Sequence, residues 1–328
     1  MKAQAEQFGN ELEVRRSLAN YYVVGLVPSF ARILLAAKQR GVCFDRVLTV
    51  GRHNWLVLGS EQNALAKEFN IAPERRGQLA WGGFADDFFL GWLGAREIVS
   101  LDASDYEGAN RIHDLNQPVP VEWNENFDVV LDAGTLEHVF HFPTAVESCL
   151  RMVRVGGTMF WSMPANNYCG HGFYQFSPEL IFRIFSPEFG FRVEQALLFT
   201  HPFPGGELSS RMDFYAIRDP DEVRSRVAFM NGVPTGMLFE ARKERRVNLF
   251  NPVPQQSDYS RAWAGKSSAQ PVFASENNRR WIALANRAAL WLERSMPRRL
   301  RNWLAGQYQK HYLFSLRNRR FFRRRRDL

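Results

Sequence analysis

The chain has 328 residues, of which 45% are hydrophobic and 23% charged, and this composition excludes a mainly disordered protein. Three scattered cysteines, Cys43, Cys149 and Cys169, exclude a disulfide framework or a zinc ribbon, so we expect a reducing, cytoplasmic setting. The net charge of +8 is unevenly divided, because residues 277–328 carry 15 basic and 2 acidic side chains and the first 276 residues carry 27 and 32. Any anionic partner is therefore expected at the C-terminal segment.

Residues 1–27 are expected to form an N-terminal extension without a secretory signal, because acidic residues occur early and no small-residue cleavage site follows an apolar run. The most apolar stretch, residues 21–37, is interrupted by Pro28 and Arg32 before it reaches the length of a membrane span. We therefore predict no transmembrane helix.

An alternation of helix and strand patterns begins at residue 28. Residues 28–40 start with proline, carry apolar residues at helical spacing and end in basic residues before Gly41, which predicts a helix. Short apolar runs predict four buried strands: residues 46–51, 97–102, 127–132 and 156–163. Residues 134–155 have a helical pattern between the last two strands, and this alternation predicts a parallel sheet with right-handed crossovers.

The connections between these strands differ in length. The first crossover, residues 52–96, is long and has apolar spacing typical of a helix near residues 84–93. After Asp102 only about eight residues precede the next possible strand, and a parallel crossover normally needs a dozen or more. We therefore expect the second crossover helix to be missing or reduced to a turn.

Three elements are predicted after residue 163. Ser177 as N-cap and Pro178 at the first helical position predict a helix through Phe185. Residues 191–199 and 211–218 predict two further strands. Residues 221–276 are rich in Pro, Asn, Gln, Ser and Arg without sustained periodicity, so we expect a linker or extension after a domain of residues 28–220.

Carboxylates occur at or shortly after the ends of the predicted strands, where open parallel sheets bind their ligands. Asp102 ends one strand, Asp114 follows soon after it, and Asp132 ends another. Aspartates also cap turns and helices, and for any one of the three this role is the simpler interpretation. Their joint position favours a ligand site.

The segment FDVVLDAGTLEHV, residues 127–139, leads into a helix ending in RMVRVGG and a strand running to Pro164. This segment resembles the region from the fourth to the fifth strand of class I S-adenosylmethionine-dependent methyltransferases. The resemblance covers residues 45–220. It implies an α/β, Rossmann-like methyltransferase fold, with a mostly parallel sheet and helices on both faces, here followed by a helical basic C-terminal extension.

The resemblance implies S-adenosylmethionine as cofactor and a methyltransferase activity. Asp102 would bind the ribose, because a carboxylate accepts two hydroxyl donors, and Asp114 and Leu115 would edge the adenine. Residues 132–135 would line the methionine end of the cofactor. The nine implied cofactor contacts are Gly51, Arg52, Asp102, Ala103, Asp114, Leu115, Asp132, Gly134 and Thr135.

The turn after the first strand departs from the family pattern. Gly51-Arg52-His53-Asn54 contains one glycine, and Thr49 replaces the acid that the family usually has in that strand. A noncatalytic adaptor that kept the sheet and lost the cofactor therefore remains as an alternative. No GxGxxG follows the strand and no GxxxxGK[ST] is present, which disfavours a nicotinamide enzyme and a phosphate loop.

Histidines are the candidate acceptor-side residues. Glu137 and His138 occupy the place where similar methyltransferases contact cofactor or acceptor, and His171 lies with Tyr174 and Gln175 in the loop after the fifth strand. Histidine suits a base that takes a proton from an oxygen nucleophile, although alignment alone can suffice for methyl transfer. We expect a catalytic or acceptor-binding role for His171, His138 and Glu137, against packing or capping.

Four histidines are candidates for one cluster at the sheet edge: His113, His138, His141 and His171. His138 and His141 are expected on one helix. No recognised ligand spacing joins the four residues, so we predict no metal site.

The basic C-terminal segment has an amphipathic pattern. In residues 279–294 apolar side chains including Trp281 and Trp291 fall on one helical face, and after Pro297 the pattern repeats with Trp303 and Tyr308. Basic helices with tryptophan on the apolar face suit an anionic membrane interface, which favours peripheral attachment at an inner membrane face. A helix that covers the body is the next alternative, and nucleic-acid binding is less favoured.

The sequence thus predicts transfer of a methyl group to an oxygen or nitrogen of a small molecule or glycan. The glycan acceptor follows from a loose resemblance to methyltransferases of bacterial surface-polysaccharide biosynthesis.

Overall fold

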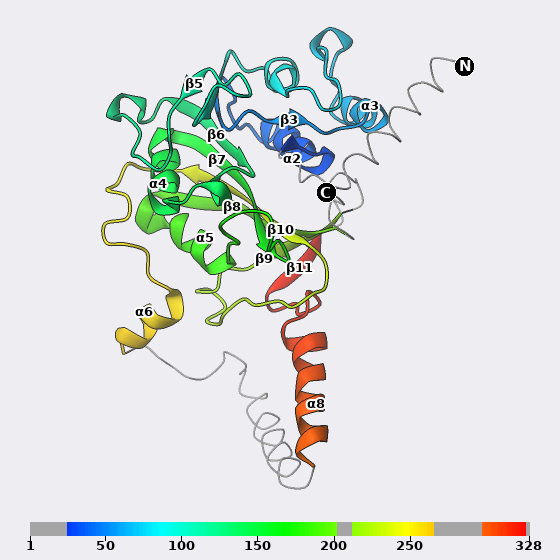
Figure 1. Cartoon of the computed structure of the whole chain (residues 1–328), viewed down its shortest axis with the longest axis vertical. Helices are drawn as coiled ribbons and strands as arrows, with labels where there is room; N and C mark the ends of the chain where they lie inside the picture. The colour runs from blue at the N-terminus through cyan, green and yellow to red at the C-terminus, as the bar shows by residue number, and fades with distance from the viewer. Residues whose placement is uncertain (1–24, 202–211, 266–296, 326–328) are drawn as a thin grey trace, which may run out of the picture.

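The computed structural model of the chain describes residues 25–201, 212–265 and 297–325. Nine of its strands form one sheet in the order β11-β9-β8-β10-β7-β6-β2-β4-β5, and β1 (Gly25–Leu26) pairs with β3 (Asn54–Trp55) beside it. Figure 1 shows the sheet running through the body, with α8 projecting away from it.

One half of the sheet is parallel. It consists of β5 (Arg111–Ile112), β4 (Glu97–Asp102), β2 (Arg46–Val50), β6 (Phe127–Ala133) and β7 (Val153–Asn166), each parallel to its neighbour. In chain order these strands lie third-second-first-fourth-fifth, which is the order of the doubly wound, Rossmann-like sheet. This strand order agrees with the Rossmann-like part of the predicted fold class.

The other half is antiparallel. β10 (Thr235–Lys243) pairs with β7 and with β8 (Phe191–Thr200), β8 pairs with β9 (Asp213–Ile217), and β9 pairs with β11 (Phe322–Arg325), all antiparallel. Four neighbouring pairs are thus parallel and four antiparallel, so the prediction of a mostly parallel sheet was wrong. The antiparallel half arises because β10 enters between β7 and β8.

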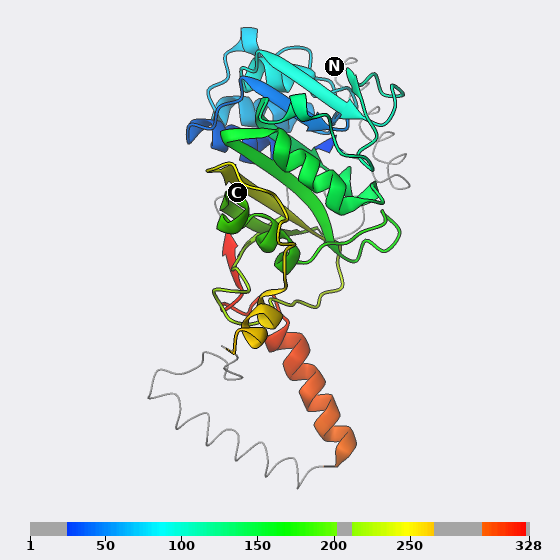
Figure 2. The ribbon, with the colours of Figure 1, turned by 90° about the vertical axis from the view of Figure 1, so that its left-hand side faces the viewer.

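Helices cover both faces of the sheet, as predicted. α2 (Pro28–Gln39), α3 (Gly59–Glu68) and the helical turn η3 (Phe88–Trp92) pack on one face, and α4 (Phe142–Met152) and α5 (Pro178–Ile184) on the other. Successive residues of β2 alternate between the two hydrophobic cores, with Val47 in one and Leu48 in the other. Figure 2 shows α4 lying along its face of the sheet.

Most predicted element bounds are confirmed within a few residues. The connection from β4 to β5 contains no helix, as the short spacing predicted. Ser177 caps α5, because its Oγ accepts a hydrogen bond from the Leu180 N–H at 3.3 Å. The single helix expected over residues 134–155 is divided: η5 (Leu136–His138) comes first, and α4 begins after His141. His138 and His141 therefore do not share a helix.

The segment expected as a linker contains a central strand. β10 lies within residues 221–276, and the segment also contains α6 (Ser257–Trp263). Charged residues conceal the strand in the sequence, but two of them, Glu240 and Lys243, are buried and have partners. Glu240 is paired with Arg40 at 2.5 Å, and the Lys243 ammonium donates to the Leu150 and Val153 carbonyls.

The basic C-terminal segment is only partly helical. α8 (Arg298–Tyr308) and η8 (Gln309–Leu313) confirm the second helical pattern, whereas the pattern at residues 279–294 lies outside the described residues. The final basic run instead forms β11, and Phe321 and Phe322 are buried in the core. No helix in the described ranges is long and apolar enough to cross a membrane.

Candidate functional site

The candidate site lies at the edge of the sheet where the parallel strands end. β4 lies on one side of β2 and β6 on the other, so the strand order reverses between β2 and β6. In open α/β sheets ligands bind outside the carboxyl ends of the strands at such a reversal. β8 runs in the same direction as β7, because each is antiparallel to β10, so its carboxyl end reaches this edge as well.

Thr135 joins β2 to β6 at the reversal, and Gly51 joins β2 to β4. The Thr135 Oγ1 hydroxyl donates to the Val50 carbonyl at 2.8 Å, and the Gly51 N–H donates to the Leu101 carbonyl at 2.7 Å. Gly51 has a φ of +76°, and a Cβ at this position would lie 2.7 Å from Thr135 Oγ1. The turn therefore requires glycine at residue 51 for its conformation and for the close approach of Thr135.

Arg52 holds two loops together. Its guanidinium pairs with Asp86 at 2.6 Å, donates to the Glu107 carbonyl at 3.0 Å and stacks 3.7 Å from the centre of the Phe84 ring. These contacts join the first crossover to the loop after β4. The resemblance placed the Arg52 side chain at the cofactor, but these contacts already engage it within the protein.

His53, next to Arg52, is buried and neutral. Its side chain lies within the body, and burial lowers its pKa to about 4. Neither ring nitrogen has a hydrogen-bond partner among the described residues. This side chain therefore belongs to the packing beneath the turn.

Asp102 ends β4 and is partly exposed. One carboxylate oxygen, Oδ1, accepts a hydrogen bond from the Ala103 N–H at 2.6 Å. In the described part of the chain, no hydrogen bond to the other oxygen occurs. This acceptor is available to the hydroxyl groups of a ligand, as the ribose assignment requires.

Asp114 and Leu115 serve the local structure. The Asp114 carboxylate accepts hydrogen bonds from the backbone and side-chain N–H groups of Asn116, which hold its pKa below the usual value. Leu115 is only 6% exposed and packs in the core. The turn-capping interpretation therefore describes Asp114, and little of Leu115 is left to contact an adenine.

Asp132 is fully buried. Its carboxylate accepts hydrogen bonds from the Thr135 N–H at 2.9 Å and the Leu136 N–H at 3.2 Å, so it caps the turn after β6. Burial and the nearby Glu137 carboxylate raise its pKa. Asp132 has no exposed surface for a ligand, whereas Thr135 remains partly exposed and Gly134 supplies a left-handed turn with a φ of +116°.

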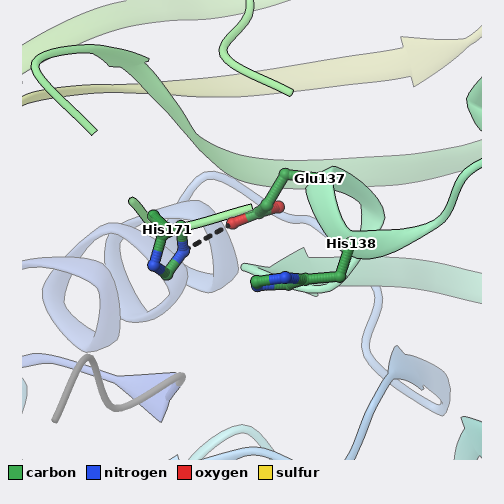
Figure 3. A group of neighbouring side chains, drawn as sticks. All are labelled: Glu137, His138 and His171. Carbon is green, nitrogen blue, oxygen red and sulfur yellow. Dashed lines mark hydrogen bonds and ion pairs between the residues drawn. The ribbon is translucent and has the colours of Figure 1, made fainter. Parts of the chain in front are cut away.

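Glu137, His138 and His171 form a cluster at the same edge. The Glu137 carbonyl accepts hydrogen bonds from the N–H groups of Phe173 at 2.9 Å and Tyr174 at 3.2 Å, which holds the loop after β7 against η5. His171 Nε2 then lies 3.2 Å from Glu137 Oε1, and the His171 and His138 rings are 5.0 Å apart (Figure 3). The prediction that His138 and His171 gather at the sheet edge agrees with this geometry, and Glu137 lies with them.

The other two candidate histidines, His113 and His141, make contacts of their own. His113 Nε2 lies 3.2 Å from the Gln117 carbonyl oxygen, and its ring packs against Trp123. His141 precedes α4 with its ring against Phe140. These two histidines are therefore not part of the cluster of Glu137, His138 and His171.

Two further residues at this edge were missed by the sequence analysis. The Tyr168 hydroxyl lies 2.5 Å from Nε2 of His201, which is buried directly after β8. The Tyr168 ring also contacts the His171 ring, with centroids 5.6 Å apart. Extending the strand-end argument to the strand at residues 191–199 would have identified His201. Tyr174 and Gln175 support the loop, through the Phe140 carbonyl and the Tyr168 N–H.

No family model matches the chain, and no curated protein matches it. Among solved structures, the chain is similar to a branched-chain polyamine synthase from Thermus thermophilus, with 16% identity, a TM-score of 0.34, and coverage of 70% of this chain and 59% of that one. It is also similar to a SAM-dependent methyltransferase from Thermotoga maritima, with 15% identity, a TM-score of 0.35, and coverage of 73% and 97%.

A third similar structure is a 16S rRNA (adenine(1408)-N(1))-methyltransferase from Catenulisporales acidiphilia, with 12% identity, a TM-score of 0.30, and coverage of 69% and 97%. The chain thus spans about three fifths of the length of the Thermus synthase. These likenesses are too low to transfer an activity, so the function must be argued from the site itself.

Proposed function

We propose that the protein transfers a methyl group from S-adenosylmethionine to an oxygen or nitrogen of a small-molecule or glycan acceptor. The observation that carries the proposal is the partly exposed Asp102 carboxylate, with one oxygen left to accept hydrogen bonds, beside the strand-order reversal. That position is where a doubly wound sheet binds a nucleotide-like ligand, and a carboxylate there binds ribose hydroxyl groups.

Three parts of the edge have separate roles in this proposal. Asp102 accepts hydrogen bonds from the ribose, and Gly51 and Gly134 provide backbone without a side chain near the cofactor. Thr135 holds the ends of β2 and β6 together through its bond to Val50. When bound, S-adenosylmethionine supplies an electrophilic methyl group.

Glu137, His138 and His171 form the acceptor side. They follow β6 and β7 directly, so a short chain connects them to the cofactor end of the same strands. Holding an acceptor in line with the methyl group supplies most of the catalysis that such a transfer needs. The exposed rings of Phe140 and Phe173 pack together beside this cluster, with centroids 6.0 Å apart, and offer apolar contact for the acceptor.

Calorimetric titration of the full chain with S-adenosylmethionine and S-adenosylhomocysteine tests the cofactor assignment. We expect both to bind and to raise the melting temperature, because a ligand of the folded state stabilises it. Asp102→Asn should weaken binding by about 10–100-fold, since hydrogen bonds to a charged group contribute about 1.5–3 kcal/mol. Asp105→Asn is the matched control, because it removes an exposed carboxylate from the same loop.

The engaged Arg52 side chain supports a second candidate, a noncatalytic adaptor. Arg52 bridges Asp86 and the Glu107 carbonyl across the turn where related enzymes have glycine. If the protein is such an adaptor, we expect that neither S-adenosylmethionine nor S-adenosylhomocysteine binds to it, in a sample shown to be folded. Equal affinities of Asp102→Asn and the unchanged protein would refute the ribose assignment alone.

The arm formed by α8 and η8, residues 298–313, supports attachment of a cytoplasmic protein to the inner face of an anionic membrane. α8 has no buried residue, and the exposed apolar side chains of Leu300, Trp303, Leu304, Tyr308 and Tyr312 recur at helical spacing. From residue 298 to 325 the sequence has ten basic residues and no acidic one. Each basic residue near such a surface contributes about 1 kcal/mol.

Cosedimentation with phosphatidylglycerol vesicles tests this attachment, with phosphatidylcholine vesicles and a single-stranded RNA as separate arms. We expect binding to the anionic vesicles that weakens with salt and falls at least tenfold in Trp303→Ser. Trp263→Ser is the control, because Trp263 is at least as exposed as Trp303 but lies on α6. RNA binding without vesicle binding would overturn the membrane proposal.

A further inference from the structure

The cluster of Glu137, His138 and His171 has the composition of a metal site. Each residue offers one ligand atom, and these three atoms lie within 4.8 Å of one another. Figure 3 shows the Glu137 carboxylate directed toward His171, with the His138 ring on the same side. The sequence spacing predicted no metal site, because His171 lies far along the chain from the adjacent pair.

Glu137 carries the argument for a ligand. Its side chain is 1% exposed, and its Oε2 is buried without a hydrogen-bond partner in the described part of the chain. A buried carboxylate oxygen without a partner is strongly unfavourable, and a cation compensates for it.

The backbone fixes the cluster before any ion binds. The Phe173 and Tyr174 N–H groups both donate to the Glu137 carbonyl, so the loop that carries His171 is held against η5. Gly172 makes this approach possible, because a Cβ there would lie 3.0 Å from the Glu137 carbonyl oxygen and 3.3 Å from His138 Cε1. The three donors therefore come from two chain segments that are already joined.

We propose that Glu137, His138 and His171 bind one divalent first-row transition-metal ion, such as Zn²⁺, Mn²⁺ or Fe²⁺. Two imidazoles and one carboxylate suit these ions rather than Mg²⁺ or Ca²⁺, which prefer oxygen ligands. A tetrahedral zinc site places ligand atoms about 3.3 Å apart, so side-chain rotation must bring the donors closer by about an ångström. Three protein ligands leave at least one coordination position open.

The open position gives the ion a role that rests on the proposed function. An acceptor hydroxyl bound there loses its proton more readily and is held near the methyl donor. Metal binding itself needs neither cofactor nor acceptor, so it is measured independently of activity.

Calorimetric titration with Zn²⁺, and the visible absorption of added Co²⁺, test the site in the full chain without an affinity tag after chelation and desalting. We expect one ion per chain with a micromolar or tighter dissociation constant. Glu137→Gln and His171→Gln should each weaken binding by more than about 100-fold, because loss of outer-shell partners alone costs 10–100-fold. His141→Gln and His113→Gln should leave it unchanged.

If Glu137→Gln fails to fold, a variant of the exposed His138 tests the site instead. His138→Gln should retain the melting temperature and still lose the ion. Zinc binding absent from the unchanged protein, or equal in all variants, would overturn the proposal. S-adenosylhomocysteine binding is measured on the same samples. If the unchanged protein binds the metal ion but not S-adenosylhomocysteine, the methyltransferase proposal is refuted and the metal site is not.

Discussion

The parallel and antiparallel halves of the sheet share β7 but have different tasks. In the parallel half the strands end at one edge, which gathers Gly51, Asp102 and Thr135 from three separate strands. In the antiparallel half neighbouring strands end at opposite edges, and β10 contributes almost only buried residues. The parallel arrangement therefore brings the candidate site residues to one edge of the sheet, and the antiparallel strands stabilise the sheet that carries them.

The two halves also use charge differently. In the parallel half the exposed Asp102 has an oxygen available to a ligand. In the antiparallel half two charged side chains of β10 are buried: Glu240 pairs with Arg40, and Lys243 donates to backbone carbonyls. Loss of core packing and loss of a strand-end contact should therefore have distinct effects, on stability in the first case and on binding in the second.

Phe239→Ala should have the largest effect on stability. Phe239 is fully buried in β10, with its ring 5.2 Å from that of Phe182 and 6.3 Å from that of Phe185. The cavity should lower the free energy of unfolding by about 3–5 kcal/mol, measured by chemical denaturation. Val253→Ala, at an exposed position in the same segment, should change it by less than about 0.5 kcal/mol. A loss below 1 kcal/mol for Phe239→Ala would contradict a core role for β10.

Acidification should destabilise the parallel half through His53. Its pKa is about 4 when folded and 6.5 ordinarily, so below pH 6.5 the unfolded chain binds a proton that the folded chain does not. Stability is therefore lost as pH falls from 6.5 toward 4, by about 3 kcal/mol from this residue.

Denaturation curves at pH 7 and pH 4 measure this loss. His53→Gln should remove the His53 share of the pH dependence, and His113→Gln, at a partly exposed ring, should not. An unchanged difference between the two pH values in His53→Gln would show that other groups cause the acid sensitivity.

Thr135→Val should have a smaller effect on stability and a measurable effect on binding. The substitution keeps the shape of the side chain and removes the hydrogen bond to the Val50 carbonyl, which costs about 1 kcal/mol. We expect S-adenosylhomocysteine to bind several-fold more weakly, because the ends of β2 and β6 are no longer joined. Thr200→Val, at the end of β8, should leave this affinity unchanged. Unaltered affinity in Thr135→Val would show that the Thr135–Val50 hydrogen bond does not contribute to cofactor binding.

Trp303→Ser should have the smallest effect on stability. Trp303 is 59% exposed on α8, so the free energy of unfolding should change by less than about 0.5 kcal/mol. Phe322→Ala, in the buried part of the same basic segment, should lower it by about 3 kcal/mol. Equal losses in the two variants would show that the arm is packed in solution.

Local patterns predicted the parallel half well, because buried parallel strands are short apolar runs between helices. β4 has the predicted bounds, and β2 ends one residue before the predicted run. β10 and β11 were hidden because charged residues interrupt them. The partner of Glu240 is Arg40, which is 200 residues away, so no local pattern identifies the strand.

The site was predicted in outline, because strand ends can be recognised in the sequence and side-chain surroundings cannot. The ribose assignment of Asp102 rests on an available oxygen, whereas Asp114 and Asp132 accept hydrogen bonds from their own turns, and their contacts with a cofactor stay predictions. The approach of His171 to Glu137 depends on backbone hydrogen bonds between η5 and the loop after β7.

The position of β10 between β7 and β8 means that the order of strands in the sheet differs from the order in which the ribosome produces them. β8 leaves the ribosome before β10, and in the finished sheet only β10 connects β8 to β7. At about 5–20 residues per second, the 43 residues from Thr200 to Lys243 take roughly 2–9 s to synthesise. During that interval the nascent chain exposes the edge of β7 and an unpaired edge of β8, which are the surfaces that chaperones bind and that aggregation begins from.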